Sequence, residues 1–256
     1  MAAEPELVVA PTPAQLAEDV AGRVVATLVA ALDERGTAHL TVTGGGILED
    51  TMRALRDLPG RDSVDWSRVH VWWGDERFVP SGSGDRNDRA AAAALFDAVP
   101  AVLHRMPADD GPLGDDADAA AGWYAAELAA AAHGDEDVPH FDVALLGIGP
   151  DGHCCSLFPE HPGVYEQDAA VIAVRNSPKP PPTRLSLTFP ALDAAAEIWF
   201  VAAGEGKANA VALALGGAGR VQVPAAGPRG THRTLWLVDR AAASHLPPHL
   251  YKPPVG

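Results

Sequence analysis

The chain has 256 residues, with 19 basic and 34 acidic side chains and a formal net charge of -15. Hydrophobic residues make up 47% and charged residues 21%, which is ordinary globular usage and excludes wholesale disorder. The acidic balance disfavours nucleic acid as a partner, because binding a polyanion requires a cluster of Lys and Arg. Cys154 and Cys155 are the two cysteines, and this count excludes a disulfide scaffold and a four-cysteine metal site.

No segment is predicted to cross a membrane, because the apolar stretches are rich in alanine and interrupted by charge. Residues 1–13 lack a basic stretch followed by an apolar run, so we expect no signal peptide and a cytoplasmic location. The length allows one large α/β domain or two small ones. Since no linker or internal repeat is visible, residues 1–256 are expected to form a single domain.

The first half of the chain alternates short β-branched runs with longer alanine-rich segments, which is typical of βαβ units and a mostly parallel sheet. A helix is predicted to begin at Thr12, with apolar residues at helical spacing, and to end at Gly36. The other elements predicted here are strands at 6–9, 39–42, 69–73 and 102–105, and helices at 47–58, 87–96 and 115–133.

The second half continues the pattern, beginning with an apolar, buried strand. Residues 178–182 are predicted to form a rigid proline loop. The other elements predicted here are strands at 141–146, 170–174, 184–188, 198–202 and 235–238, and a helix at 207–215. The whole order predicts an α/β fold with a mostly parallel central sheet.

Polar, glycine-rich clusters follow several of these predicted strands. In an open α/β sheet, ligands bind beyond the carboxyl ends of the strands, so such clusters are expected to converge on one rim. The clusters are residues 43–46, 75–77, 147–153 and 204–207.

The first cluster is a glycine run between a strand and a helix. Its backbone N–H groups can turn towards a ligand at the helix N-terminus, which favours an anion such as phosphate. A tight turn needing backbone freedom is an equally good interpretation. The run matches neither the Rossmann fingerprint nor a P-loop, so it gives little support for a nucleotide. The residues concerned are Thr43, Gly44, Gly45 and Gly46.

Two further clusters supply charged groups. Arg77 follows Asp75 and Glu76 at a strand end, and its planar guanidinium suits a phosphate or a carboxylate. Taken alone, a structural ion-pair network is the favoured interpretation of these three residues. Lys207 lies at a predicted helix start and is either a second cation of the site or a solvated surface lysine.

The segment 147–153 carries the best candidate for catalysis. It delivers His153 and Asp151 to the rim from a buried strand. A histidine there can act as a general base near neutral pH, and the aspartate two residues earlier can orient it. Cys154 is a weak candidate for a nucleophile, because adjacent side chains generally point apart. The histidines form neither an HxH nor an HExxH pair, so no metal site is predicted.

The motifs together resemble a known family. The strings GIGPDGHCCSLFP, WWGDERFVP, NSPKPPPTRLSLTFPAL, TVTGGG and GEGKANAV are similar, in order, to those of the glucosamine-6-phosphate isomerase/6-phosphogluconolactonase family. The resemblance spans residues 40–215. It implies a modified Rossmann-like, three-layer α/β fold. It also implies hydrolysis of 6-phosphogluconolactone to 6-phosphogluconate in the oxidative pentose phosphate pathway, with no metal or organic cofactor.

The resemblance also implies roles by position. His153 matches the catalytic histidine and Asp151 the aspartate that accompanies it. Substrate and phosphate contacts are expected from Thr43, Gly44, Gly45, Gly46, Asp75, Arg77, Arg184 and Lys207.

The chain departs from the family pattern at the phosphate loop. Gly46 and Ile47 stand where the family has two hydroxyl residues. Glu49 and Asp50 follow in the first helical turn, where their charge opposes a phosphate unless they point away.

Two alternatives remain open. An amino-sugar phosphate deaminase or isomerase of the same fold is expected to carry a glutamate near Phe158, where this chain is apolar. A non-catalytic sugar-phosphate-binding domain would need no general base. In every case the expected partner is a small sugar phosphate, and the expected state is a monomer or a weak dimer.

Overall fold

The computed structural model describes residues 4–134, 136–247 and 250 of the chain. Its main sheet has seven strands in the order β1-β10-β9-β6-β2-β3-β5, and every neighbouring pair is parallel. The predicted mostly parallel central sheet is therefore confirmed. The strands are Glu6–Ala10 (β1), Ala38–Val42 (β2), Val69–Trp73 (β3), Val102–His104 (β5), Val143–Gly147 (β6), Glu197–Ala202 (β9) and Arg233–Asp239 (β10).

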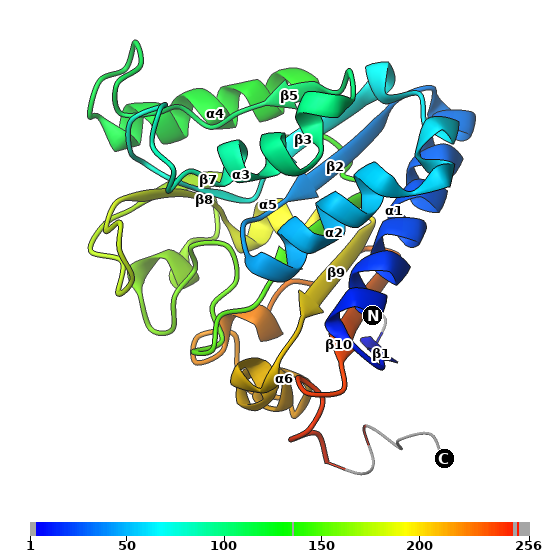
Figure 1. Cartoon of the computed structure of the whole chain (residues 1–256). Helices are drawn as coiled ribbons and strands as arrows, with labels where there is room; N and C mark the ends of the chain where they lie inside the picture. Colours follow the sequence, from blue (N-terminus) through cyan, green and yellow to red (C-terminus); the bar gives the residue numbers. More distant parts are fainter. Residues whose placement is uncertain (1–3, 135, 248–249, 251–256) are drawn as a thin grey trace.

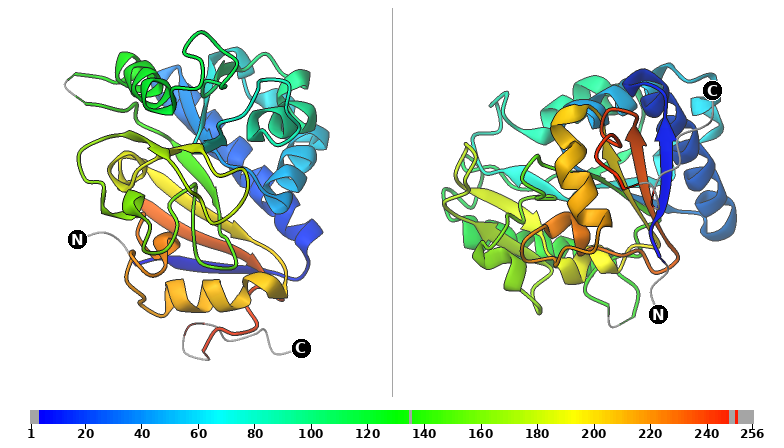
Figure 2. Two further views of the ribbon diagram at one scale, coloured as in Figure 1. Left: turned by 90° about the vertical axis from the view of Figure 1, so that its left-hand side faces the viewer. Right: turned by 90° about the horizontal axis from the view of Figure 1, so that it is seen from below.

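Helices cover both faces of this sheet, which gives three layers (Figures 1 and 2). Right-handed crossovers place three helices on one face: Pro13–Arg35 (α1), Gly46–Asp57 (α2) and Asn87–Ala94 (α3). The same rule places Ala117–Ala131 (α4) and Ala208–Leu215 (α6) on the other face. Among the residues described, no helix combines the length and the apolar character needed to cross a bilayer.

A second, smaller sheet of three antiparallel strands lies beside the first. Its order is β4-β8-β7, from Asp75–Arg77 (β4), Arg184–Leu187 (β8) and Val171–Val174 (β7). Residues 75–77 were predicted to follow a strand end as a polar cluster, and their pairing as the separate strand β4 was not predicted. Gly74 makes the change of sheet possible, because its N–H donates to Val42 O and its carbonyl accepts from Leu187 N, both at 2.8 Å. The short helix Phe189–Asp193 (α5) was not predicted.

The ends of the helices follow their capping residues. Thr12 Oγ1 accepts a hydrogen bond from Gln15 N at 3.2 Å, and Gly36 ends α1 at φ 79°, as predicted. Helix α4 begins two residues later than predicted, because the side chain of Asp116 caps it by accepting from Asp118 N and Ala119 N. At its C-terminus α4 stops at Ala131 rather than residue 133, and α3 stops at Ala94 rather than residue 96.

A row of aromatic side chains crosses β2, β3 and β5 on the α4 side of the sheet. His39 stacks on His70 at 5.0 Å between ring centroids, and His70 stacks on His104 at 5.2 Å. Trp72 covers His104 at 3.7 Å and donates from Nε1 to His39 Nδ1. Burial, followed by the charge of neighbouring histidines, lowers the pKa of both His39 and His104 to about 4.

We expect this row to make the fold sensitive to acid. The unfolded chain takes up these protons near pH 6.5, whereas the folded chain holds both rings neutral down to about pH 4. Their contribution to stability is therefore constant above about pH 7 and falls as the pH is lowered from 6.5 towards 4.

A His104→Phe variant keeps a ring over Trp72 but does not titrate. Between pH 7 and pH 5, the wild-type Tm should fall by about 2–4 °C more than that of the variant, as expected for a difference of roughly 1 kcal/mol. Thermal unfolding followed by circular dichroism measures this. Equal falls in Tm would remove His104 as a source of acid sensitivity.

Candidate active site

A cavity of about 560 Å³ opens at the carboxyl ends of β2, β6 and β9. Strands β2 and β6 are neighbours, but the chain leaves them towards opposite faces of the sheet, and such a switch point forms a crevice. The predicted clusters thus converge on one rim. The predicted site residues that line the cavity are Thr43, Gly44, Gly45, Gly46, Asp75, Arg77, His153, Arg184 and Lys207.

Asp151, the remaining predicted site residue, lies behind the histidine. Its Oδ1 is 2.5 Å from His153 Nδ1. A carboxylate this close requires Nδ1 to carry the proton, which leaves the lone pair on Nε2. Burial acts to raise the pKa of Asp151, but the hydrogen bonds and charges of His153 and Lys179 outweigh it and hold that pKa well below its usual range. The pair therefore has the geometry of an oriented base.

Lys179, from the proline loop, completes this group. Its Nζ lies 3.1 Å from Asp151 Oδ1 and 3.2 Å from His153 Nδ1. The ammonium group neutralises the aspartate and places a positive charge beside the imidazole. Lys179 was not predicted as a site residue, although it stands within the SPKPPP string.

Gly149 makes the His153–Asp151 pair sterically possible. Its N–H donates to His153 O at 2.8 Å, so the turn folds back on itself. A Cβ at this position would overlap His153 Nδ1 and Asp151 Oδ1. Glycine is therefore required by close approach, and not by an unusual backbone angle.

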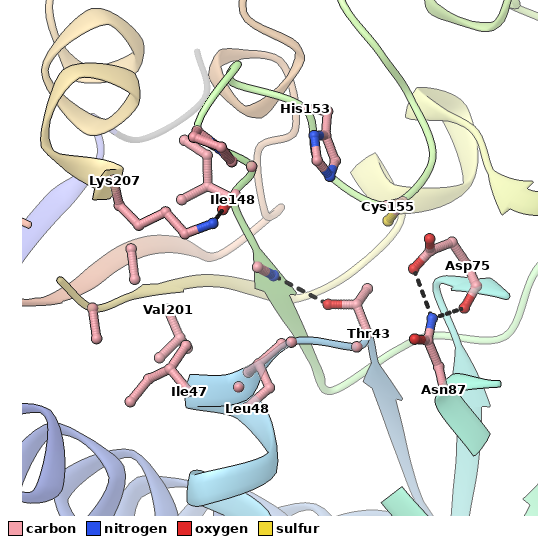
Figure 3. A pocket seen from close by; sticks show the side chains of 18 of the residues that line it. Thr43, Ile47, Leu48, Asp75, Asn87, Ile148, His153, Cys155, Val201 and Lys207 are labelled. Atoms are coloured by element: carbon pink, nitrogen blue, oxygen red, sulfur yellow. Dashed lines mark hydrogen bonds between the residues drawn. The ribbon is translucent and has the colours of Figure 1, made fainter. Parts of the chain in front are cut away.

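Thr43 joins the two loops that form the floor of the cavity (Figure 3). Its hydroxyl donates to Leu145 O at 3.2 Å and accepts from Gly147 N at 3.1 Å. The hydroxyl proton is therefore donated to a backbone carbonyl and does not point towards a bound anion. A phosphate contact at Thr43 remains a prediction, and its side chain bridges β2 and β6.

Gly44 is contacted by Asn87, the first residue of α3. A Cβ on Gly44 would overlap Asn87 Oδ1, so the amide packs directly against the glycine turn. Asn87 Nδ2 donates to Asp75 O at 2.9 Å, and Asp75 Oδ2 accepts from Ser156 Oγ at 2.7 Å. Asp75 is buried, and these contacts fix it at one side of the cavity. Asn87 was not predicted as a site residue.

The acidic residues after the glycine turn are paired. Arg53 bonds both Glu49 and Asp50 on the exposed surface of α2. Asp50 still lines the cavity, but its charge is offset by the guanidinium. Ile47 contributes only an apolar side chain, so the polar groups of this turn are backbone N–H groups.

Cations stand at two sides of the cavity. Lys207 donates from Nζ to Ile148 O at 2.6 Å, on the side opposite Asp75 in Figure 3. Burial, followed by the charge of Lys179, lowers the pKa of Lys207, so an anion bound nearby would stabilise its charge. Arg77 lies on the Asp75 side, where it donates from Nη1 to Asp85 O.

Arg184 lines the cavity, but its donors are used by the proline loop. Nη2 donates to the carbonyls of Lys179 and Pro180, and Nε donates to Pro181 O, all at 3.1 Å. Its Nη1 lies 4.0 Å from Asp75 Oδ2. In this arrangement the Arg184 guanidinium holds the loop that carries Lys179, so its Nε and Nη2 are not free to bind a phosphate together.

An apolar wall closes the site beside the histidine. The ring of Phe158 lies 4.7 Å from that of His153, and the Arg184 guanidinium lies 5.5 Å from the Phe158 ring centre.

Cys154 and Cys155 are buried, and burial raises the pKa of both thiols, so neither is activated as a nucleophile. In the part of the chain that the structure describes, no group of three His, Cys, Asp or Glu side chains is placed to hold a metal ion.

Comparisons with known proteins identify the family of the chain. A sequence model of the family described as glucosamine-6-phosphate isomerases/6-phosphogluconolactonase matches residues 11–236. The chain belongs to this family. A protein from Streptomyces coelicolor named 6-phosphogluconolactonase is 54% identical over 258 residues, which cover 99% of each chain. A Mycobacterium tuberculosis protein of the same name is 48% identical over 229 residues, covering 88% of this chain and 92% of the relative.

The solved structures of the family have the same fold. The 6-phosphogluconolactonase from Trypanosoma brucei aligns with a TM-score of 0.82 at 25% identity, covering 95% of this chain and 99% of that one. The resemblance stated from the motifs, and the Rossmann-like three-layer fold that it implied, are therefore confirmed.

We predict that Gly149→Ala disrupts the base without unfolding the chain. The added methyl group must displace His153 or Asp151, and a shift of about 1 Å at a reacting group can cost on the order of 100-fold in rate. The fall should appear in kcat, with Tm changed little. Gly122→Ala in α4 is the matched control, since a Cβ there meets open space among the described residues. Full activity of Gly149→Ala would show that the pair is not needed.

Proposed function

We propose that the chain hydrolyses 6-phospho-D-glucono-1,5-lactone to 6-phospho-D-gluconate. The observation that carries the proposal is the His153–Asp151 pair at the mouth of a cation-lined cavity. The relatives named 6-phosphogluconolactonase support the choice of substrate.

His153 acts as the general base in this proposal. With Nδ1–H donated to Asp151, Nε2 removes a proton from water as that water attacks the lactone carbonyl. The imidazolium then returns the proton to the ring oxygen as the C1–O bond breaks. Asp151 keeps the ring oriented during both transfers, and Lys179 holds Asp151 by donating to its Oδ1. A positioned base typically contributes ~10²–10⁴-fold to the rate.

The phosphate of the substrate binds over the glycine turn. Backbone N–H groups of Gly44–Gly46 and the positive end of α2 face the anion. Lys207 and Arg77, which both line the cavity, supply the cations that bind it. Because the phosphate is held away from the reacting carbon, its binding energy orients the lactone towards His153.

The alternatives differ at identifiable residues. Phe158 places an apolar ring where the sequence analysis expects a glutamate in the deaminases, and this favours a lactonase. A non-catalytic sugar-phosphate-binding domain would have no need for the hydrogen-bonded His153–Asp151 pair. Glucosamine 6-phosphate with an ammonia readout tests the first alternative, and ligand-induced stabilisation without turnover would support the second.

The proposal extends to the state of the protein. Residues 1–256 are proposed to act as one cytoplasmic domain, active as a monomer, because segments from Pro13 to Lys207 of a single chain line the cavity. The mechanism assigns no role to a metal or an organic cofactor.

Freshly generated 6-phosphogluconolactone should be hydrolysed with acid release, at the same rate with and without a chelator. His153→Ala should lower kcat by roughly 10²–10⁴-fold, because water then has no positioned base. His245→Ala, at an exposed position, is the matched control. Activity of His153→Ala within a few-fold of wild type would reject the assigned base.

Arg77→Met and Lys207→Met should each raise KM about tenfold or more, with a smaller effect on kcat, since a charge-assisted hydrogen bond is worth roughly 1.5–3 kcal/mol. Competitive inhibition by inorganic phosphate should weaken in parallel. Arg56→Met removes an exposed arginine paired with Asp57 and serves as the control. If inhibition by phosphate is unchanged in one variant, that cation does not bind the phosphate.

A further inference from the structure

Glu76 is a fully buried carboxylate that the mechanism above does not use. It is the middle residue of β4, and side chains alternate along a strand. Its neighbours Asp75 and Arg77 face the cavity, so Glu76 points the other way, towards the start of α3. From the sequence, an ion-pair network is the favoured interpretation of Glu76 and its two neighbours.

The carboxylate accepts three backbone N–H groups. Oε1 accepts from Arg77 N at 2.8 Å and from Asn87 N at 2.6 Å, and Oε2 accepts from Asp88 N at 2.8 Å. Asn87 and Asp88 are the first residues of α3, so Glu76 caps this helix from eleven positions earlier in the chain. Arg86 Nη2 lies 3.8 Å from Oε2, but the same guanidinium bonds Asp88 at 3.1 and 3.2 Å, so the two carboxylates share its charge.

These hydrogen bonds fix both ends of the loop formed by residues 78–86. Arg77 precedes this loop and Asn87 follows it, and both side chains line the cavity. Asn87 in turn contacts Gly44 and donates to Asp75 O, while Arg77 donates to Asp85 O within the loop. One buried carboxylate thus determines where an arginine and an amide stand beside the glycine turn.

We propose that ionised Glu76 is a positioning residue, which fixes Arg77 and Asn87 against the anionic end of the substrate without touching it. The inference rests on the proposed function and deepens it. A neutral side chain at this position cannot replace the carboxylate, because an amide has one oxygen and directs N–H groups at a backbone N–H. Loop 78–86 would then lose a carboxylate that holds both of its ends, and Arg77 would lose its fixed position.

The state of this carboxylate is sensitive to pH near neutrality. Burial raises the pKa of Glu76 to about 7, against the opposing effects of Arg86 and of the two backbone N–H groups of α3. Protonation as the pH falls through 7 should therefore mimic the neutral variant. The charged or titratable groups coupled electrostatically to Glu76 are Arg86 and Asp88 at the start of α3, Tyr124 of α4, and Arg184 on the cavity side of β8; Arg105 bonds Asp88.

The test is Glu76→Gln in the full chain, assayed with the lactone from pH 6 to pH 8. At pH 8 we expect KM to rise about tenfold with kcat changed less than threefold, the size expected when a charge-assisted contact is lost. The ratio of variant KM to wild-type KM should shrink towards one at pH 6. Because the substrate phosphate itself titrates in this range, competitive inhibition by sulfate, which stays a dianion, is measured in parallel, and the ratio of variant to wild-type inhibition constants should shrink towards one at pH 6 in the same way.

The matched control is Asp88→Asn. Asp88 is in the same buried network, bonded to Arg86, but its carboxylate contacts neither Arg77 nor Asn87. This control should lower Tm while leaving KM within twofold of wild type. Glu76→Gln should raise KM by a smaller factor in the Arg77→Met background than in the wild type, because part of the effect of Glu76 passes through Arg77 and the rest through Asn87.

Each remaining outcome is decisive. A KM ratio that stays constant with pH, or a KM for Glu76→Gln within twofold of wild type at pH 8, would overturn the inference while the lactonase proposal stands. A wild type that turns over no lactone would instead contradict the proposed function. If Glu76→Gln does not fold, the wild type and Arg77→Met are compared across the same pH range. The rise in KM below pH 7 should then be smaller in Arg77→Met, and equal rises would contradict the inference.

Discussion

The site depends on the Thr43 hydroxyl group, which takes the place of a backbone hydrogen bond between two neighbouring strands. Strands β2 and β6 pair in parallel over Leu40–Val42, and at the next position the chains separate to open the crevice. Thr43 Oγ1 then donates to Leu145 O and accepts from Gly147 N, which continues the connection for one more step. The glycine turn and the histidine turn both leave from this point. Their spacing is therefore fixed by one side chain, and the cavity lies between them.

The cavity has a charge that opposes that of the protein. The chain carries a net charge of -15, but four cations line the cavity, and one of the two carboxylates there is offset by Arg53. These cations come from separate segments: Arg77 from β4, Lys179 and Arg184 around the proline loop, and Lys207 after β9. Local charge, and not net charge, is what an anionic substrate meets at the site.

Much of this arrangement could be predicted from local sequence patterns. The parallel strands, the caps of α1 and the convergence of glycine-rich turns follow from periodicity, capping residues and strand direction. Asp75–Arg77 could not be recognised as a strand, because its partner β8 lies more than a hundred residues later and the pairing depends on that contact. Lys179 and Asn87 were missed because each is held by a side chain outside its own turn, Arg184 or Glu76, and no periodicity or capping pattern indicates such a side chain-to-backbone contact. The SPKPPP string was the signal that could have pointed to Lys179.

The small sheet has a consequence for local stability. It has only three short strands, yet it supplies Arg77 directly and, through Arg184, supports the loop that carries Lys179. The histidine turn follows β6 of the larger parallel sheet. A partial opening confined to β4, β7 and β8 would thus release Arg77 and, with the proline loop, withdraw Lys179 from Asp151. Amide hydrogen exchange along these three strands reports on the free energy that keeps both residues in place.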